Sequence, residues 1–216
     1  MSDIIKSILS EIPDKSKWSS TTSLQFKSDL ADWCGDRFKD DVVLEVGSHV
    51  GQTTMILSLL FKEVYTININ PPGDSDNSLF EITETLEESD FYRLYKCNLR
   101  NNQNHKFENV YYVRQNSYGN RGWCPKIPDV RICFIDAIQT YDAVVEDIEN
   151  ALLKNTEYFV FDDYGLYPEI KDAIDKYVEL GVLKVERYLG WSKGKNSVGG
   201  VDKVFHDREG IICSRV

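Results

Sequence analysis

The sequence lacks several features that would each indicate a particular class of protein. No apolar run approaches the ~20 residues of a membrane span, and the first residues, Met1 to Lys6, do not form a secretory signal pattern. The five cysteines are an odd number, widely spaced and without a C-x-x-C pair. Such cysteines favour neither a disulfide framework nor a zinc site. We therefore expect reduced thiols, a cytoplasmic location and no contact with a membrane.

Positive charge is also scarce. The chain carries 25 Lys and Arg against 35 Asp and Glu, which gives a formal net charge of −10. General nucleic-acid binders are more often basic, so we expect no nucleic-acid partner, although a local basic patch stays open as an exception. A hydrophobic content of 42% in 216 residues is enough for one folded domain with a full core.

The most informative stretch runs from Val42 to Thr54. An apolar, β-branched run that carries Glu45 closes on Gly47, and Gly51 follows after three residues, just before an apolar helical run. This order predicts a buried strand, a tight turn and a helix start. Because glycine has no side chain, a ligand can approach such a turn closely. The dinucleotide and phosphate-loop patterns are absent, and an ordinary strand-to-helix connection is the alternative.

Apolar periodicity predicts strands and helices in alternation along the rest of the chain. We expect two helices within residues 3–38, a loop with some helix over 73–90, a helix over 91–99 and a loop over 190–200. The predicted strands after the glycine turn are 64–70, 110–114, 131–136, 158–161, 183–189, 201–205 and 211–216. We expect the last two to pair with each other across a turn.

This alternation predicts an α/β fold. We expect a Rossmann-like, doubly wound sheet of seven mostly parallel strands, with helices on both faces and an N-terminal helical cap. One domain should span residues 1–216, with 1–40 as a helical cover and 41–216 as the core. Ligands of such sheets bind beyond the carboxyl ends of the strands. Polar residues follow several predicted strands at those ends, namely Glu45, Asn68, Asn116, Ser117, Asp136, Asp162 and Asp163.

Three segments taken together resemble class I S-adenosylmethionine-dependent methyltransferases. They are residues 42–54, residues 134–148 beginning at Phe134-Ile135-Asp136, and residues 159–164 with the pair Asp162-Asp163. The combination is most similar to the small metal-dependent O-methyltransferases, which include the catechol type and the macrocin type that modifies sugars. The resemblance implies an enzyme that transfers a methyl group from S-adenosylmethionine to a hydroxyl of a small acceptor. A sugar or glycan is the first expectation, and a phenolic small molecule is the alternative.

The resemblance also implies which residues hold the cofactor and a metal ion. The implied cofactor ligands are Glu45, Gly47, Ser48, Gly51, Thr53, Asn68, Asn116, Ser117 and Asp136. Asn68 stands where the family normally has an acidic residue for the ribose hydroxyls. Asp136, Asp162 and Asp163 match positions that hold a divalent ion in metal-dependent members, with Mg²⁺ expected first and Ca²⁺ or Mn²⁺ as alternatives. Three neighbouring carboxylates would otherwise repel one another, and hard divalent ions prefer such oxygen ligands.

Gln139 departs from the family, which often has Lys or His three residues beyond the first aspartate. Glutamine cannot act as a general base at neutral pH, but it can orient an acceptor by hydrogen bonding. Asp136 is then the candidate base, with the metal as an alternative. An inactive, methyltransferase-like binding module is a second hypothesis, and a methyltransferase acting on RNA or protein is a third. Four aromatic residues after strands are candidates for the acceptor pocket: Trp123, Tyr164, Tyr167 and Trp191. A homodimer is left open.

Overall fold

The computed structural model describes residue 7 and residues 22–74, 78–100, 107–119, 122–198 and 201–216. Its helices are α3 (Leu24–Cys34), α4 (Gln52–Leu60), α5 (Tyr141–Leu153) and α6 (Pro168–Glu179). The strands of the main sheet are β1 (Val42–Val46), β2 (Glu63–Asn68), β3 (Phe80–Glu88), β4 (Arg93–Leu99), β5 (Phe107–Arg114), β6 (Ile132–Ile135), β7 (Tyr158–Phe161), β8 (Leu183–Leu189) and β11 (Gly210–Arg215). A separate two-stranded sheet consists of β9 (Gly194–Val198) and β10 (Val201–Phe205).

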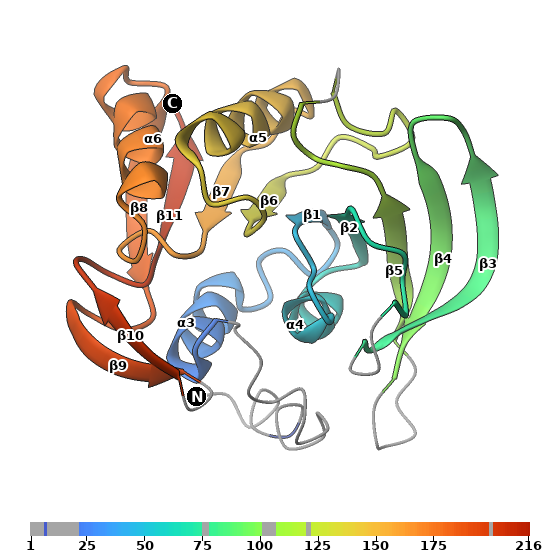
Figure 1. Ribbon diagram of the computed structural model, residues 1–216, viewed down its shortest axis with the longest axis horizontal. Coiled ribbons are helices and arrows are strands. Elements are labelled where there is room, and N and C mark those ends of the chain that lie inside the picture. The colour runs from blue at the N-terminus through green and yellow to red at the C-terminus, as the bar shows by residue number, and fades with distance from the viewer. Residues whose placement is uncertain (1–6, 8–21, 75–77, 101–106, 120–121, 199–200) are drawn as a thin grey trace.

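The main sheet lies between two layers of helices. Its strand order is β3-β4-β5-β2-β1-β6-β7-β11-β8. Helices α3 and α4 cover one face, and α5 and α6 cover the other (Figure 1). Strands β5, β2, β1, β6 and β7 run parallel to their neighbours in this group. This is the doubly wound α/β arrangement that the sequence predicts.

The chain reverses its winding direction at β1. From this strand it proceeds outward to β2 and β5, and it then crosses to β6 on the other side of β1. The carboxyl ends of β1 and β6 therefore diverge into connections on opposite faces of the sheet. In open α/β sheets this switch point is where ligands bind, so it is the place to look for a site.

The predicted strand count of seven was wrong, because the sheet has nine strands in the described part of the chain. The two extra strands, β3 and β4, form an antiparallel hairpin in segments that were predicted as a loop and a helix. Strand β3 is an edge strand whose side chains are mostly exposed on both faces. Its sequence therefore lacks the apolar alternation from which a strand is predicted. Its acidic residues disfavour pairing with a further strand at this edge.

The predicted pairing of the last two strands was also wrong. β10 pairs with β9, which lies in a segment predicted as a loop. β11 instead enters the main sheet antiparallel between β7 and β8. Its first four residues, from Gly210 to Cys213, are buried. A continuous buried run of this kind is typical of a central strand, because both of its faces are covered.

Helix α3 matches the second of the two predicted N-terminal helices. Its N-cap is Ser23, whose Oγ accepts a hydrogen bond from Phe26 N at 3.0 Å. Phe26 and Leu30 are buried against the sheet in the same core as α4. The first predicted helix lies outside the described residues. None of the helices within the described ranges is long and apolar enough to cross a membrane.

Candidate active site

The turn after β1 depends on two glycines. Gly47 has φ +91°, and a Cβ at this position would lie 2.0 Å from the backbone oxygen of Asp136. Gly51 has φ +96° and precedes α4, and its N–H donates to Ser48 O at 2.8 Å. Both glycines adopt the left-handed conformation that other residues avoid. The first also allows the turn to pack directly on the backbone that follows β6.

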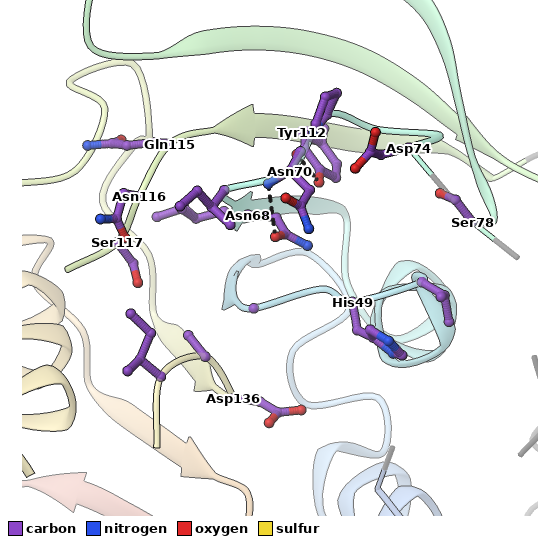
Figure 2. Close-up of a pocket in the computed structure, with 17 residues that line it drawn as sticks. His49, Asn68, Asn70, Asp74, Ser78, Tyr112, Gln115, Asn116, Ser117 and Asp136 are labelled. Carbon is purple, nitrogen blue, oxygen red and sulfur yellow. Dashed lines mark hydrogen bonds between the residues drawn. The ribbon is translucent and has the colours of Figure 1, made fainter. Parts of the chain in front are cut away.

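A cavity of about 410 Å³ lies beyond the carboxyl ends of β1, β2, β5 and β6 (Figure 2). Its volume is typical of a small-molecule site. The predicted residues that line it are Gly47, Asn68, Asn116, Ser117 and Asp136. His49, which lies within the glycine turn, also lines it, and sequence reasoning missed the polar lining residues Asp74, Ser78, Tyr112 and Gln115. Several of these belong to connections whose path over the cavity depends on the tertiary fold.

Asn68 is held in a defined orientation at the end of β2. Its Nδ2 donates to Ser48 Oγ at 3.1 Å, and its Oδ1 lies 3.4 Å from the N–H of Asn70. The hydroxyl of Tyr112 donates to the carbonyl of Asn70 at 2.8 Å, which fixes the chain just beyond Asn68. These contacts connect the turn after β1 to the end of β2. At the end of β2, an amide and not a carboxylate therefore faces the cavity.

Four predicted cofactor ligands do not line this cavity: Glu45, Ser48, Gly51 and Thr53. Glu45 is fully buried beneath the turn, where its Oε2 accepts a hydrogen bond from Thr54 Oγ1 at 2.6 Å. Burial raises the pKa of Glu45 to about 7, against the lowering effect of the hydroxyl hydrogen bonds. The assignment of these four residues as cofactor ligands stays a prediction. In the structure, the Glu45–Thr54 and Gly51–Ser48 hydrogen bonds stabilise the turn after β1.

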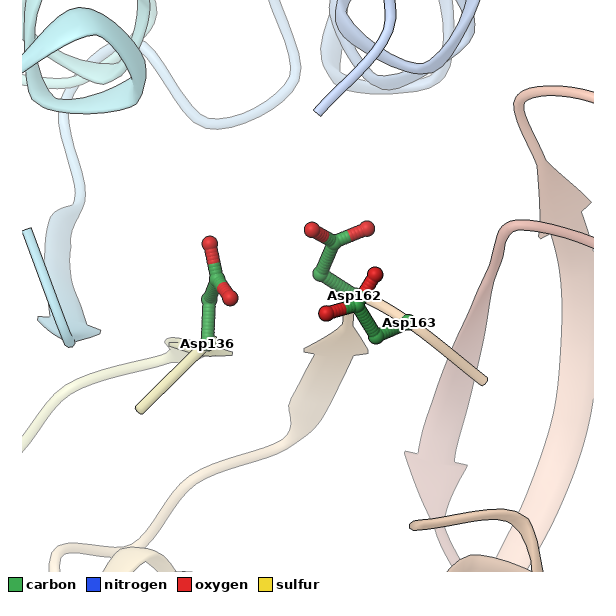
Figure 3. Close-up of side chains that lie close together, drawn as sticks. All are labelled: Asp136, Asp162 and Asp163. Carbon is green, nitrogen blue, oxygen red and sulfur yellow. The ribbon is translucent and has the colours of Figure 1, made fainter. Parts of the chain in front are cut away.

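The carboxylates of Asp136, Asp162 and Asp163 gather at the ends of β6 and β7 (Figure 3). One oxygen from each lies within 4.8 Å of the others. Asp163 has a left-handed φ of +56°, and its carbonyl accepts from the N–H groups of Leu166 and Tyr167 at 2.9 and 3.2 Å. Backbone strain at a residue other than glycine is often found where a side chain must be aimed precisely.

Burial and mutual repulsion dominate the electrostatics of this acidic cluster. Burial, followed by the charge of Asp163, raises the pKa of both Asp136 and Asp162 well above the usual range. The pKa of Asp163 is also raised by burial, although nearby Lys203 opposes the shift. Asp162 is only 5% exposed, and its Oδ1 has no hydrogen-bond partner among the described residues. Such an atom is costly to leave unpaired in a buried position.

Gln139 contacts the acidic cluster directly. Its Nε2 donates to Asp163 Oδ2 at 2.8 Å. The side chain of Gln139 therefore supports a carboxylate and is itself anchored by it. Gln139 therefore lies beside the acidic cluster, and its predicted catalytic role and its contact with an acceptor stay predictions.

Two lysines near the acidic cluster were missed by sequence reasoning. Lys27 lies on α3 and is fully buried, and Lys203 lies on β10 with its Nζ 3.8 Å from Asp163 Oδ1. The first had a local signal, because Lys27, Ala31 and Cys34 share the helical spacing of a buried face. A lysine on such a face usually has a buried partner. The second had no signal, because its contact depends on how β10 folds back.

The four aromatic candidates for an acceptor pocket separate into two groups. Trp123 and Tyr164 are buried, and the hydroxyl of Tyr164 donates to Asp175 Oδ1 at 2.7 Å. These two rings belong to the core, so the expectation that they line an acceptor pocket was wrong. Tyr167 is exposed and Trp191 is partly exposed, so both stay available to an acceptor.

Comparison with known proteins supplies a fold assignment. No protein-family model and no curated protein matches the chain. Among solved structures, an S-adenosylmethionine-dependent O-methyltransferase from Thermotoga maritima is similar with a TM-score of 0.56, at 13% identity over 94% of this chain and 69% of that one. The chain has the fold of class I S-adenosylmethionine-dependent methyltransferases.

Two further solved structures share this methyltransferase fold. A magnesium protoporphyrin IX methyltransferase from Synechocystis PCC 6803, with bound cofactor, has a TM-score of 0.55 at 10% identity, over 94% of this chain and 89% of that one. A tRNA (m1A58) methyltransferase from Aquifex aeolicus also has a TM-score of 0.55, at 13% identity over 98% and 75%. The names of these proteins cover unrelated acceptors, so the acceptor has to be inferred from the site.

Proposed function

We propose that this protein is an S-adenosylmethionine-dependent O-methyltransferase, assisted by a divalent metal ion, that methylates a hydroxyl of a small acceptor. The observation that carries the proposal is the position of Asp136. This residue lines the cavity at the switch point and also belongs to the acidic cluster. A methyl donor in the cavity and an acceptor at the cluster would therefore be neighbours, and methyl transfer depends largely on such positioning.

The acidic cluster has the donor set that a hard divalent cation prefers. Asp136, Asp162 and Asp163 offer only oxygen ligands, and the unpartnered Oδ1 of Asp162 would gain a partner. When bound, such a cation would lower the pKa of an acceptor hydroxyl and orient its oxygen. The three aspartates would hold the cation, and the amide of Gln139 would keep Asp163 in place.

The chain's own residues account for the proton. Bound S-adenosylmethionine would supply the methyl group, and a carboxylate oxygen of Asp136 would accept the proton that the acceptor hydroxyl loses. The candidate base is the carboxylate oxygen of Asp136 that does not bind the cation. Gln139 has no titratable group and serves only to position its neighbours.

A sugar or glycan is our first choice of acceptor, and a phenol is the alternative. Sugar rings pack against exposed aromatic side chains, and Tyr167 is exposed one turn beyond Asp163. The second candidate function is an inactive module that binds a ligand without transferring a methyl group. Gln139 favours it, because an amide occupies the position from which a base would be expected to act.

Binding of S-adenosylhomocysteine tests the proposal directly. We expect the wild-type protein to bind it in a calorimetric titration and to show an additional heat of binding with Mg²⁺. Asp162→Ala should keep cofactor binding, because Asp162 does not line the 410 Å³ cavity, and should lose the response to Mg²⁺. Failure of the wild-type protein to bind S-adenosylhomocysteine with or without Mg²⁺ would reject the enzyme and favour the inactive module.

Asn68→Asp tests where the ribose of the cofactor lies. A carboxylate forms stronger hydrogen bonds with hydroxyl groups than an amide does, so we expect about tenfold tighter binding of S-adenosylhomocysteine. The matched control is Asn70→Asp, which adds the same charge at another residue of the cavity wall. An equal gain in the control, or weaker binding in Asn68→Asp, would show that Asn68 does not contact the ribose.

A further inference from the structure

Two lysines reach the acidic cluster from elements outside the parallel sheet. Lys27 belongs to α3 and is 1% exposed, with its Nζ donating to the carbonyl and the hydroxyl of Thr22 at 2.5 Å each. Lys203 belongs to β10, and its side chain is 17% exposed beside an Asp163 side chain that is 7% exposed. Ammonium groups are rarely buried to this extent unless negative charges compensate them.

The charges around Lys27 come from the cluster itself. Burial lowers the pKa of Lys27 to about 8, and the nearby charges of Asp162, Glu209 and Asp136 oppose this shift. Lys203 has a direct geometric contact, since its Nζ is 3.8 Å from Asp163 Oδ1. Lys203 thus contacts the acidic cluster directly, and Lys27 interacts electrostatically with Asp162 and Asp136.

The structure fixes α3, and with it Lys27, in this position. Glu209, which is 2% exposed, accepts hydrogen bonds from Ser23 N at 2.7 Å, Ser23 Oγ at 2.5 Å and Trp191 N at 3.0 Å. Asp29 on the same helix accepts from Gly190 N at 2.9 Å. These contacts hold both the start and the middle of α3 against the segment after β8. Because these contacts fix α3, they also fix the backbone position of Lys27.

Carboxyl groups outnumber ammonium groups at the cluster. Four carboxylates, those of Asp136, Asp162, Asp163 and Glu209, act with two ammonium groups. A divalent cation would still be attracted there, but less strongly than by the carboxylates alone. Coulomb energies between groups a few ångströms apart inside a protein are large enough to change such an affinity by a factor of ten or more.

We propose that Lys27 and Lys203 are built-in counter-ions of the three-aspartate cluster, and that they set its affinity for a divalent cation by competing with it. The proposal rests on the metal site of the proposed function, and it does not depend on the identity of the acceptor. On this proposal, side chains of α3 and β10 influence the metal affinity of aspartates that follow strands of the main sheet.

Removing either charge should tighten metal binding. In calorimetric titrations with MnCl₂ at pH 7, we expect Lys203→Gln and Lys27→Met to bind Mn²⁺ at least about tenfold more tightly than the wild-type protein. Lys193→Gln is the matched control, since it removes the same charge from an exposed position in the segment before β9. This control should bind Mn²⁺ as the wild-type protein does. Detectable Mn²⁺ binding in Lys203→Gln alone would also support the proposal.

Each variant should first be checked for a cooperative thermal transition. Lys27 is fully buried, so Lys27→Met can fail to fold, and the partly exposed Lys203→Gln then decides the question. Unchanged or weaker Mn²⁺ binding in Lys203→Gln would overturn the proposal, and so would an equal gain in the control. Absence of Mn²⁺ binding in every variant would also overturn it. Retained binding of S-adenosylhomocysteine would then leave the methyltransferase proposal standing.

Discussion

Gly47→Ala is expected to abolish binding of S-adenosylhomocysteine and to destabilise the fold by about 3 kcal/mol. The new Cβ would lie 2.0 Å from the carbonyl oxygen of Asp136 and 2.6 Å from its carbon. Backbone atoms cannot move aside cheaply, so either the turn after β1 or the segment after β6 must shift. Both line the cavity, and the loss should appear in calorimetric titration and in urea unfolding.

The control for this substitution is Gly181→Ala. Gly181 also has a left-handed φ, of +69°, but a Cβ there would meet no atom within 4 Å. Only the backbone preference is lost, which costs about 1 kcal/mol, and cofactor binding should be unchanged. If Gly47→Ala binds S-adenosylhomocysteine as the wild-type protein does, the turn after β1 is not part of the cofactor site.

The turn at Gly47 could be predicted because its causes are local. A buried β-branched run, two glycines and an apolar helix follow one another within a few residues, and each constrains the backbone by itself. The three aspartates could be placed for a similar reason. Asp136 and Asp162 directly follow strands β6 and β7, and parallel neighbouring strands bring their carboxyl ends together.

The hairpin of β3 and β4 could not be predicted in the same way. Strand β3 is exposed on both faces, so it lacks the alternation of buried and exposed residues that reveals most strands. Its stability comes from pairing with β4, and β4 in turn pairs with β5. The same limit applies to Lys203, because its contact with Asp163 exists only once β10 has paired with β9.

Asp147 leads to the second large expected effect. This residue of α5 is 1% exposed, and burial, with a smaller contribution from the charge of Glu146, raises its pKa from 3.8 to about 7. The folded state therefore holds a proton that the unfolded state releases between about pH 4 and pH 7. Since the unfolded state binds fewer protons in this window, Asp147 lowers the stability of the protein as the pH rises through it.

Asp147→Asn keeps the shape of the side chain and removes this charge. We expect the variant to be more stable than the wild-type protein by about 4 kcal/mol at pH 8, because each unit of pKa shift corresponds to ~1.4 kcal/mol. The difference should grow between about pH 4 and pH 7 and stay constant above that range. Urea unfolding at pH 5.5 and pH 8 measures it.

The matched control for Asp147→Asn is Asp142→Asn. Asp142 is an exposed residue in the first turn of the same helix. Its substitution should change stability by no more than about 0.5 kcal/mol, with little dependence on pH. A gain in Asp147→Asn that is equal at pH 5.5 and pH 8 would mean that packing, and not the buried charge, is responsible. A gain confined to high pH would show that the buried charge of Asp147 destabilises the folded state. Asp147 interacts with Ser117, which lines the cavity.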